Sequence, residues 1–230
     1  MASVVSQIFG PEPSWPEQDL VALSDDLDPW LVLEAYKAGV FPMPLPHVTF
    51  TAKIGWWSPM ARAVLLLDDL RVTRSLRQAT RRYTVTIDTD FPAVLAGCAD
   101  PSRPHGWIDS DIEAAYTGLF EAGHVHSVET RDADGVVVGG LYGVGIGGLF
   151  AGESMFHTAR DASKVALVAL VEFLQQAGGN RLLDVQWLTP HLESLGATEI
   201  SRQEYLSVLD DALLLPTPAW PPRHVPRQAE

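Results

Sequence analysis

Apolar residues recur at helical spacing in four segments, each bounded by residues that favour helix ends. Asp28-Pro29 and Gly39 bound the first segment and predict a helix over 29–38. The other helices are predicted from Thr73 to about Arg82, from a capping box beginning at Ser110 to Gly123, and from Asp161 to Gly178.

Between these helices the apolar residues alternate with polar ones, which is typical of half-buried strands. Strands are predicted over 62–67, 124–131, 135–143, 148–156 and 182–187. Turn residues near 132–135 and 145–148 join the middle three into a meander. Meander, helix and strand follow one another in the acyltransferase fold that also includes coenzyme A dependent N-acetyltransferases. We therefore expect an α+β fold with an acetyltransferase-like mixed sheet.

Clusters of proline divide the chain into three parts. The proline-rich connection around 42–59 predicts a boundary between a small N-terminal domain, residues 1–60, and a catalytic domain, residues 61–215. Five prolines between 216 and 226 predict a C-terminal tail over 216–230.

Composition narrows the class of protein. Of the 230 residues, 47% are hydrophobic and 20% charged, values that exclude disordered and fibrous chains. The 16 Lys and Arg against 29 Asp and Glu give a formal charge of -13, which argues against a protein that binds nucleic acid with its whole surface. One cysteine, Cys98, and an N-terminus without a basic and then apolar leader predict a cytoplasmic protein with no membrane contact.

One segment departs from the acidic balance. Five of the sixteen basic residues lie within twelve positions that contain no acid: Arg71, Arg74, Arg77, Arg81 and Arg82. Three of them, Arg74, Arg77 and Arg81, share one face of the predicted helix. A solvated helix face would explain such a run, but solvated faces usually mix the two signs of charge. A patch for an anionic partner is the alternative.

The strand over 182–187 carries the clearest chemical signal. A period of two places Asp184 and Gln186 on one face, and sends Leu183, Val185 and Trp187 to the other. A carboxylate and an amide on a buried strand need partners, so the pair is either a structural feature of the core or a functional site. Glu153, which follows an apolar strand, is a second acid. Two acids with an amide suit orienting an amine and handling its proton.

Other potential sites are weaker. His124 and His126 share a strand face but lack a third ligand at a useful spacing, so we interpret them as structural and expect no metal. Cys98 lies in an apolar segment and is expected to be a buried core residue. Ser154 lacks the pattern of a serine hydrolase, and the glycines over 139–152 lead into more strand rather than into a nucleotide-binding helix.

Seven motifs together resemble one family, the leucyl/phenylalanyl-tRNA protein transferases. They are AYKAGVFP (35–42), WWSPMARAVL (56–65), HSVE (126–129), GGLYGV (139–144), LFAGESMF (149–156), ASKVAL (162–167) and DVQWLTPHLESLGA (184–197). The chain departs from many relatives at three positions: Met43 replaces Trp, Gln78 replaces a basic residue, and His157 replaces Ser.

The resemblance implies roles for particular residues. Asp184 and Gln186 correspond to the proposed catalytic pair, and Glu153 to the acid that holds the α-amino group of the transferred amino acid. Trp107 corresponds to an aromatic that stacks near the terminal adenosine, with Tyr36 and Met43 as further substrate-binding positions. The implied pocket for the transferred side chain is Leu141, Phe150, Met155, Leu167 and Leu170, and the implied tRNA-binding residues are Arg71, Arg74, Arg77, Arg81 and Arg82.

The activity that the resemblance implies is transfer of Leu or Phe, with Met as a further option, from aminoacyl-tRNA to proteins that begin with Arg or Lys. Its products are marked for degradation by the N-degron pathway. No cofactor is expected, and we expect a monomer. Two alternatives stay open at the level of residues: an N-acetyltransferase, disfavoured because 157–161 contains no glycine to cradle a pyrophosphate, and a non-catalytic RNA-binding module, which leaves Glu153 and Asp184 unexplained.

Overall fold

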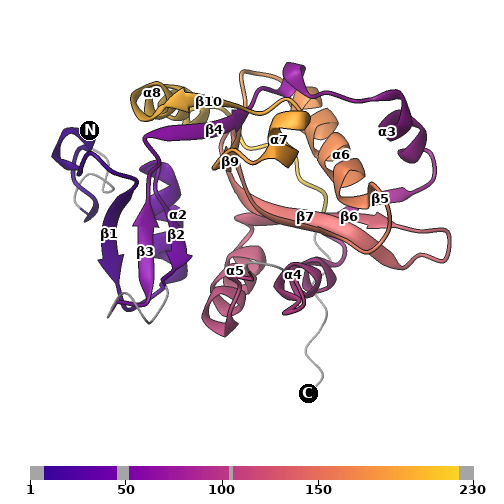
Figure 1. The fold of residues 1–230 in the computed structure, drawn as a ribbon, viewed down its shortest axis with the longest axis horizontal. Helices are drawn as coiled ribbons and strands as arrows, with labels where there is room; N and C mark the ends of the chain where they lie inside the picture. The colour runs from indigo at the N-terminus through magenta and orange to yellow at the C-terminus, as the bar shows by residue number, and fades with distance from the viewer. Residues whose placement is uncertain (1–7, 46–51, 104–105, 223–230) are drawn as a thin grey trace.

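The computed structural model describes residues 8–45, 52–103 and 106–222 (Figure 1). The described helices are α2 (Pro29–Lys37), α3 (Arg74–Ala79), α4 (Phe91–Ala99), α5 (Ser110–Ala122), α6 (Ala162–Gln176), α7 (Pro190–Ser194) and α8 (Arg202–Leu213), with short 3₁₀ turns η1 (Glu12–Ser14) and η2 (Leu67–Asp69). None of the helices in this part of the chain is long and apolar enough to pass through a bilayer.

The described strands form two sheets. The smaller has the order β1-β3-β2 and consists of β1 (Leu20–Ser24), β2 (Phe41–Pro44) and β3 (Ile54–Trp57). The larger has the order β10-β4-β9-β8-β7-β6-β5 and consists of β4 (Ala61–Leu65), β5 (Thr84–Ile87), β6 (Val125–Arg131), β7 (Val137–Ile146), β8 (Leu149–His157), β9 (Leu182–Gln186) and β10 (Thr198–Ser201). The predicted α+β fold with a mixed sheet is confirmed, because β8 and β9 are parallel while every other neighbouring pair is antiparallel.

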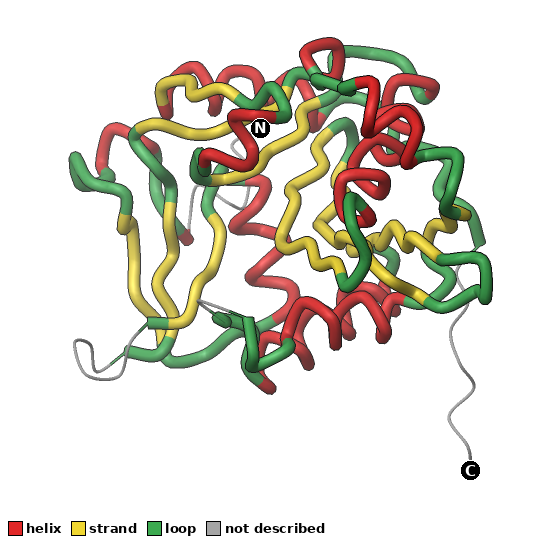
Figure 2. The backbone as a smooth tube through the Cα atoms, turned by 45° about the vertical axis from the view of Figure 1, so that its right-hand side comes forward, coloured by secondary structure: helices red, strands yellow, loops and turns green. Residues whose placement is uncertain are grey.

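Helices cover both faces of the larger sheet (Figures 1 and 2). The face toward α4 and α5 is packed with Phe91, Tyr116, Tyr142 and Val144, and this core continues into α2 and the smaller sheet through Tyr36 and Trp56. The opposite face packs against α3, α6 and α7. The two sheets therefore share one continuous core, and the predicted domain boundary near residue 60 falls on the link between β3 and β4.

Local signals explain most helix ends. The Asp28 carboxylate accepts hydrogen bonds from the backbone N–H of Trp30 and Leu31, and Pro29 occupies the first helical position, as predicted for α2. Gly123 ends α5 in the left-handed conformation with φ 89°. The predicted capping box of α5 was wrong, because Asp109, one residue before Ser110, accepts the capping hydrogen bonds.

The described part of the predicted C-terminal tail, residues 216–222, contacts the rest of the chain. Trp220 stacks on His126 with ring centroids 3.9 Å apart and also contacts Phe150 and Phe173, while the Arg181 guanidinium donates a hydrogen bond to the Pro216 carbonyl. The segment is therefore held to the rest of the described chain at Pro216 and Trp220. The predicted tail beyond residue 222, with Pro226, lies outside the described residues, as do 46–51 of the predicted domain boundary.

Candidate active site

The site lies where β8 and β9 separate. Their parallel pairing runs from Leu149 and Leu182 to Ala151 and Asp184, and the two strands are not paired beyond that point. On β8, Ser154 pairs with Tyr142 of β7. Gly152 pairs with the next residue of β7, so Glu153 is the extra residue of a β-bulge. The bulge leaves Glu153 at the opening between the strands.

A second bulge lies on β9. Asp184 pairs with Val64 and Gln186 with Ala63, so Val185 is the extra residue. Gln186 then adopts φ 66°, a left-handed conformation that few residues other than glycine adopt. As predicted, the structure brings Asp184 and Gln186 together. The prediction that Trp187 continues the face of Leu183 and Val185 was wrong, because Trp187 packs on Phe41 and Trp57 in the other part of the core.

Asp184 is fully buried, and hydrogen bonds occupy both of its carboxylate oxygens. Oδ1 accepts from Nε of Arg62 at 2.9 Å and from the backbone N–H of Gln186 at 2.9 Å. Oδ2 accepts from Nη2 of Arg62 at 2.6 Å and from the Tyr205 hydroxyl at 2.8 Å. Although burial by itself lowers the pKa of Arg62, the Asp184 carboxylate raises it above the ordinary value. The pair is therefore an ionised, bidentate salt bridge inside the core.

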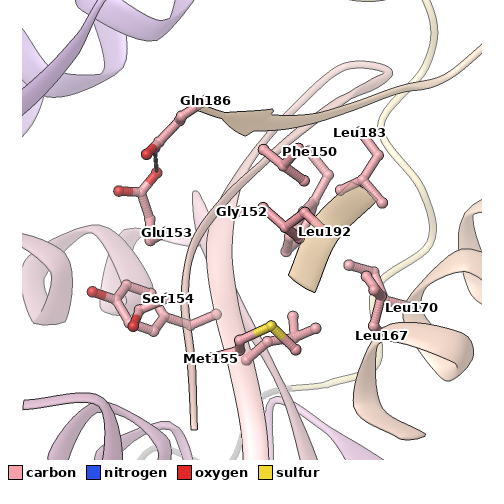
Figure 3. A pocket seen from close by; sticks show the side chains of 13 residues that line it. Phe150, Gly152, Glu153, Ser154, Met155, Leu167, Leu170, Leu183, Gln186 and Leu192 are labelled. Atoms are coloured by element: carbon pink, nitrogen blue, oxygen red, sulfur yellow. Dashed lines mark hydrogen bonds between the residues drawn. The ribbon is translucent and has the colours of Figure 1, made fainter. Parts of the chain in front are cut away.

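Glu153 has a different environment. Its carboxylate accepts hydrogen bonds from the hydroxyl groups of Tyr36 and Tyr116, the latter at 2.8 Å. It also accepts one from the Gln186 amide at 3.2 Å (Figure 3). Among the described residues, no lysine or arginine pairs with it. Burial raises the pKa of Glu153 from 4.5 to about 7, although the two tyrosine hydroxyls oppose the shift. Glu153 is thus a buried acid that can bind a cationic group such as an ammonium.

An apolar pocket of about 130 Å³ opens beside Glu153 and Gln186. All five residues implied for the side-chain pocket line it: Leu141, Phe150, Met155, Leu167 and Leu170. Leu183, Val185 and Leu192 complete its walls. In Figure 3 these apolar side chains surround the hollow, while Glu153 and Gln186 face each other at one side of it. The pocket can hold an apolar side chain whose amine lies at the carboxylate.

Other predicted substrate residues lie farther from this pocket. Tyr36 belongs to the site through its hydrogen bond to Glu153. Met43 on β2 and Trp107 before α5 are half-buried at the edge of the core and do not line the pocket.

The basic segment is exposed at all five arginines, but its helix is shorter than predicted. Helix α3 ends at Ala79, so Arg81 and Arg82 lie in the turn that follows. The prediction of one helical face for Arg74, Arg77 and Arg81 was therefore wrong at Arg81. None of these five side chains forms an ion pair with another described residue. Their charge is available to a partner.

His126 and Cys98 are both buried, as expected for residues of the core. Nδ1 of His126 lies 2.6 Å from the Asp88 carboxylate in a buried pair. Among the described residues, no group of three or more His, Cys, Asp or Glu side chains is placed to hold a metal ion. Cys98 is buried, and burial raises the pKa of its thiol to about 11, which disfavours a nucleophilic role.

Sequence reasoning missed three residues of the site. Arg62, Tyr116 and Tyr205 hold the two carboxylates from β4, α5 and α8. The one local signal was Arg62 itself, an arginine in the apolar strand 62–67, since such a charge is expected to have a buried partner. The tyrosines occupy ordinary apolar positions of amphipathic helices and carry no such signal.

Two protein-family models match this chain. The model of the leucyl/phenylalanyl-tRNA protein transferase matches residues 64–210, and the model of its N-terminal domain matches residues 25–60. The chain belongs to the leucyl/phenylalanyl-tRNA protein transferase family. The resemblance read from the seven motifs is thereby confirmed.

Two similar transferases support this membership. The leucyl/phenylalanyl-tRNA–protein transferase of Afipia carboxidovorans is 47% identical over 84% of this chain and 85% of its own length. That of Rubrobacter xylanophilus is 47% identical over 82% of this chain and 96% of its own. Among solved structures, a GCN5-related N-acetyltransferase from Kribbella flavida matches 61% of this chain and 55% of its own, with a TM-score of 0.38 and 16% identity.

Proposed function

We propose that this member of the transferase family moves leucine or phenylalanine from aminoacyl-tRNA to the N-terminus of a protein. The observation that carries the proposal is the apolar pocket that ends at the buried Glu153 carboxylate, which pairs with no cation of the described residues. Such a pocket accommodates the side chain of Leu or Phe and places its ammonium group at Glu153, with Met as a third substrate that would fit. The transferred residue would lower the pKa of Glu153, because the ammonium charge stabilises the carboxylate.

The reaction needs no covalent enzyme intermediate. An aminoacyl ester is already activated, so the amine of the acceptor protein attacks the ester carbonyl, forms the amide and releases the tRNA 3′ oxygen as an alcohol. The catalytic contribution is to hold both groups, stabilise the oxyanion and accept the proton of the amine. This requirement fits a site with carboxylate and amide groups, and neither a metal nor coenzyme A is part of the proposal.

Within this mechanism we assign different roles to the two predicted catalytic residues. The Gln186 amide lies at the pocket, bonded to Glu153, and can contact the reacting groups. Asp184 has no free lone-pair direction, because Arg62, Tyr205 and the Gln186 backbone use both oxygens. We therefore propose that Asp184 is a positioning residue that fixes Gln186, rather than the base.

The proposal also covers the acceptor proteins, the cellular location of the enzyme and the fate of its products. Acceptors begin with Arg or Lys, and the net charge of -13 favours the approach of such cationic N-termini. A monomer acts in the cytoplasm, where aminoacyl-tRNA is found, and its products enter the N-degron pathway. Trp107 and Met43 contact the terminal adenosine, and the five arginines from Arg71 to Arg82 contact tRNA phosphates.

One assay tests the reaction. Purified protein is mixed with radiolabelled Leu-tRNA and a peptide that begins with Arg, and label is expected in the peptide. A peptide whose N-terminal amine is acetylated is the control and should stay unlabelled. Transfer of an acetyl group from acetyl-CoA in place of leucine would support the acetyltransferase alternative, and tRNA binding without transfer to any peptide would support the RNA-binding one.

A further inference from the structure

A larger hollow continues from the amino acid pocket along the surface. Its volume is about 620 Å³, and Met155 lines both spaces. The larger hollow is also lined by Arg103, His157, Ser163 and His191. The floor of the site therefore changes from apolar to cationic directly outside the pocket.

A second hollow, of about 510 Å³, adjoins this larger hollow of about 620 Å³ and shares His157, Ser163 and His191 with it. It adds Arg160 and Lys164, so that three formally charged cations and two histidines line the combined space. The acids that line it are Asp161, which lies 3.7 Å from Lys164 and 3.5 Å from Arg160, and the exposed Asp100. Three cations against these two carboxylates leave surplus positive charge, in a protein that is otherwise strongly acidic.

The charges in this space also influence one another. Burial lowers the pKa of His191, and the charges of Lys164 and His157 lower it further. His157 contacts Ser163 through Nδ1 at 3.4 Å, which keeps the ring at the wall of the hollow. His191 is therefore a neutral hydrogen-bond donor near pH 7, while Arg160 and Lys164 supply the charge that favours the entry of an anion.

The two hollows connect with the basic helix α3. The Tyr83 hydroxyl donates a hydrogen bond to the Arg160 carbonyl at 2.9 Å. Tyr83 follows Arg81 and Arg82, and α3 packs on α6, the helix that carries Lys164. A cationic path therefore runs from α3, past Arg160 and Lys164, to the histidines beside the pocket.

We propose that His157, Arg160, Lys164 and His191 bind the phosphodiester backbone of the unpaired 3′ end of aminoacyl-tRNA. This inference rests on the proposed function, which places the ester at the pocket and other tRNA phosphates at the five arginines from Arg71 to Arg82. The single-stranded 3′ nucleotides must cross the surface between these two points, and their phosphates require cations along the way. His157, where many relatives have Ser, would make this contact particular to the present chain.

The test compares donors with and without these phosphates. Rates of transfer to an Arg-peptide are measured with leucyl-tRNA, with the leucyl ester of the trinucleotide CCA, and with leucyl-adenosine, which has no phosphate. Wild-type protein should use the trinucleotide better than leucyl-adenosine. In the double variant Arg160→Ala, Lys164→Ala, kcat/KM for the trinucleotide should fall by on the order of tenfold or more, as expected for two lost charged contacts. Leucyl-adenosine should be used at the wild-type rate.

Lys37→Ala is the matched control. Lys37 pairs with Glu34 three residues before it, as Lys164 pairs with Asp161, but it does not line either hollow. The proposal is overturned if wild-type protein gains nothing from the trinucleotide over leucyl-adenosine, or if the double variant loses as much activity with leucyl-adenosine as with the trinucleotide. Absence of transfer from all three donors, leucyl-tRNA included, would contradict the proposed function instead.

Discussion

At the scale of single residues, the two buried carboxylates differ in the groups that surround them. Asp184 lies against the Arg62 guanidinium, whereas Glu153 is surrounded by neutral hydroxyl and amide groups. An acid without a cation in a buried position keeps its proton to a higher pH. The carboxylate on β8 is therefore a group that titrates near neutral pH.

The raised pKa of Glu153 predicts how stability depends on pH. The folded chain holds this proton up to about pH 7 and the unfolded chain only to about pH 4.5, so the free energy of unfolding should fall as pH rises between these values. The loss should be roughly 3 kcal/mol. Glu153→Gln has no such proton. The difference in unfolding free energy, wild type minus variant, should therefore decline over this range in urea titrations at several pH values. A difference that stays constant from pH 4 to pH 8 would show that Glu153 titrates normally.

Gln186→Gly should separate folding from catalysis. The left-handed backbone at φ 66° costs an L-residue about 1 kcal/mol that glycine does not incur, which offsets the lost hydrogen bond to Glu153. Stability should stay within about 1 kcal/mol of wild type. Single-turnover transfer should slow by on the order of 10² to 10³, the usual effect of removing one polar group from a reacting centre. The control is Gln186→Asn, which keeps an amide and tolerates this backbone. A wild-type rate in the glycine variant would show that Gln186 takes no part in the mechanism.

At the scale of elements, the sequence predicted what local signals determine. The start of α2, the end of α5 and the meander depend on caps, glycines and alternation within a few residues. The bulges at Glu153 and Val185 depend on the register of the neighbouring strands and could not be predicted from β8 or β9 alone. The sequence also predicted that Glu153 is a candidate site residue. It did not predict the contact of Glu153 with Tyr36, because the two residues are 117 positions apart and meet only in the folded chain.

Helix α3 should supply most of the tRNA affinity. Replacing Arg74 and Arg77 with Glu should weaken binding of every tRNA tested and reduce the slope of log K against log salt by roughly one unit for each lost phosphate contact. Filter binding at several salt concentrations measures both quantities. Replacement of the same residues with Lys keeps the charge and should keep the slope. Unchanged affinity and slope in the Glu variant would mean that tRNA binds elsewhere.

At the scale of the whole molecule, the N-terminal part is tied to the catalytic part by polar contacts as well as by the shared core. The buried Arg202, the first residue of α8, donates hydrogen bonds to the carbonyls of Pro16, Gln18 and Ser58. Tyr36 of α2 reaches Glu153. The site therefore depends on residues from both sides of the predicted domain boundary.

Arg202→Met should loosen this connection. Three carbonyl groups lose a charged donor, so stability should fall by about 3 kcal/mol. Amide hydrogen exchange in β1 should become faster than in β6. Arg181→Met is the comparison, since Arg181 bonds the carbonyls of Gly147, Ala177 and Pro216 at the far side of the sheet and should leave β1 unaffected. Exchange in β1 that is equal in both variants would contradict the assigned role of Arg202.

The packing of Trp220 on His126 has a consequence for how the protein is made. Translation proceeds from the N-terminus, so Trp220 leaves the ribosome after every residue that it covers. Until then the buried pair of His126 and Asp88, and the Phe173 ring, are open to water on that side. A nascent chain cut short before residue 216 would therefore expose an aromatic surface to chaperones and proteases, and the cell would have a means of telling an unfinished transferase from a finished one.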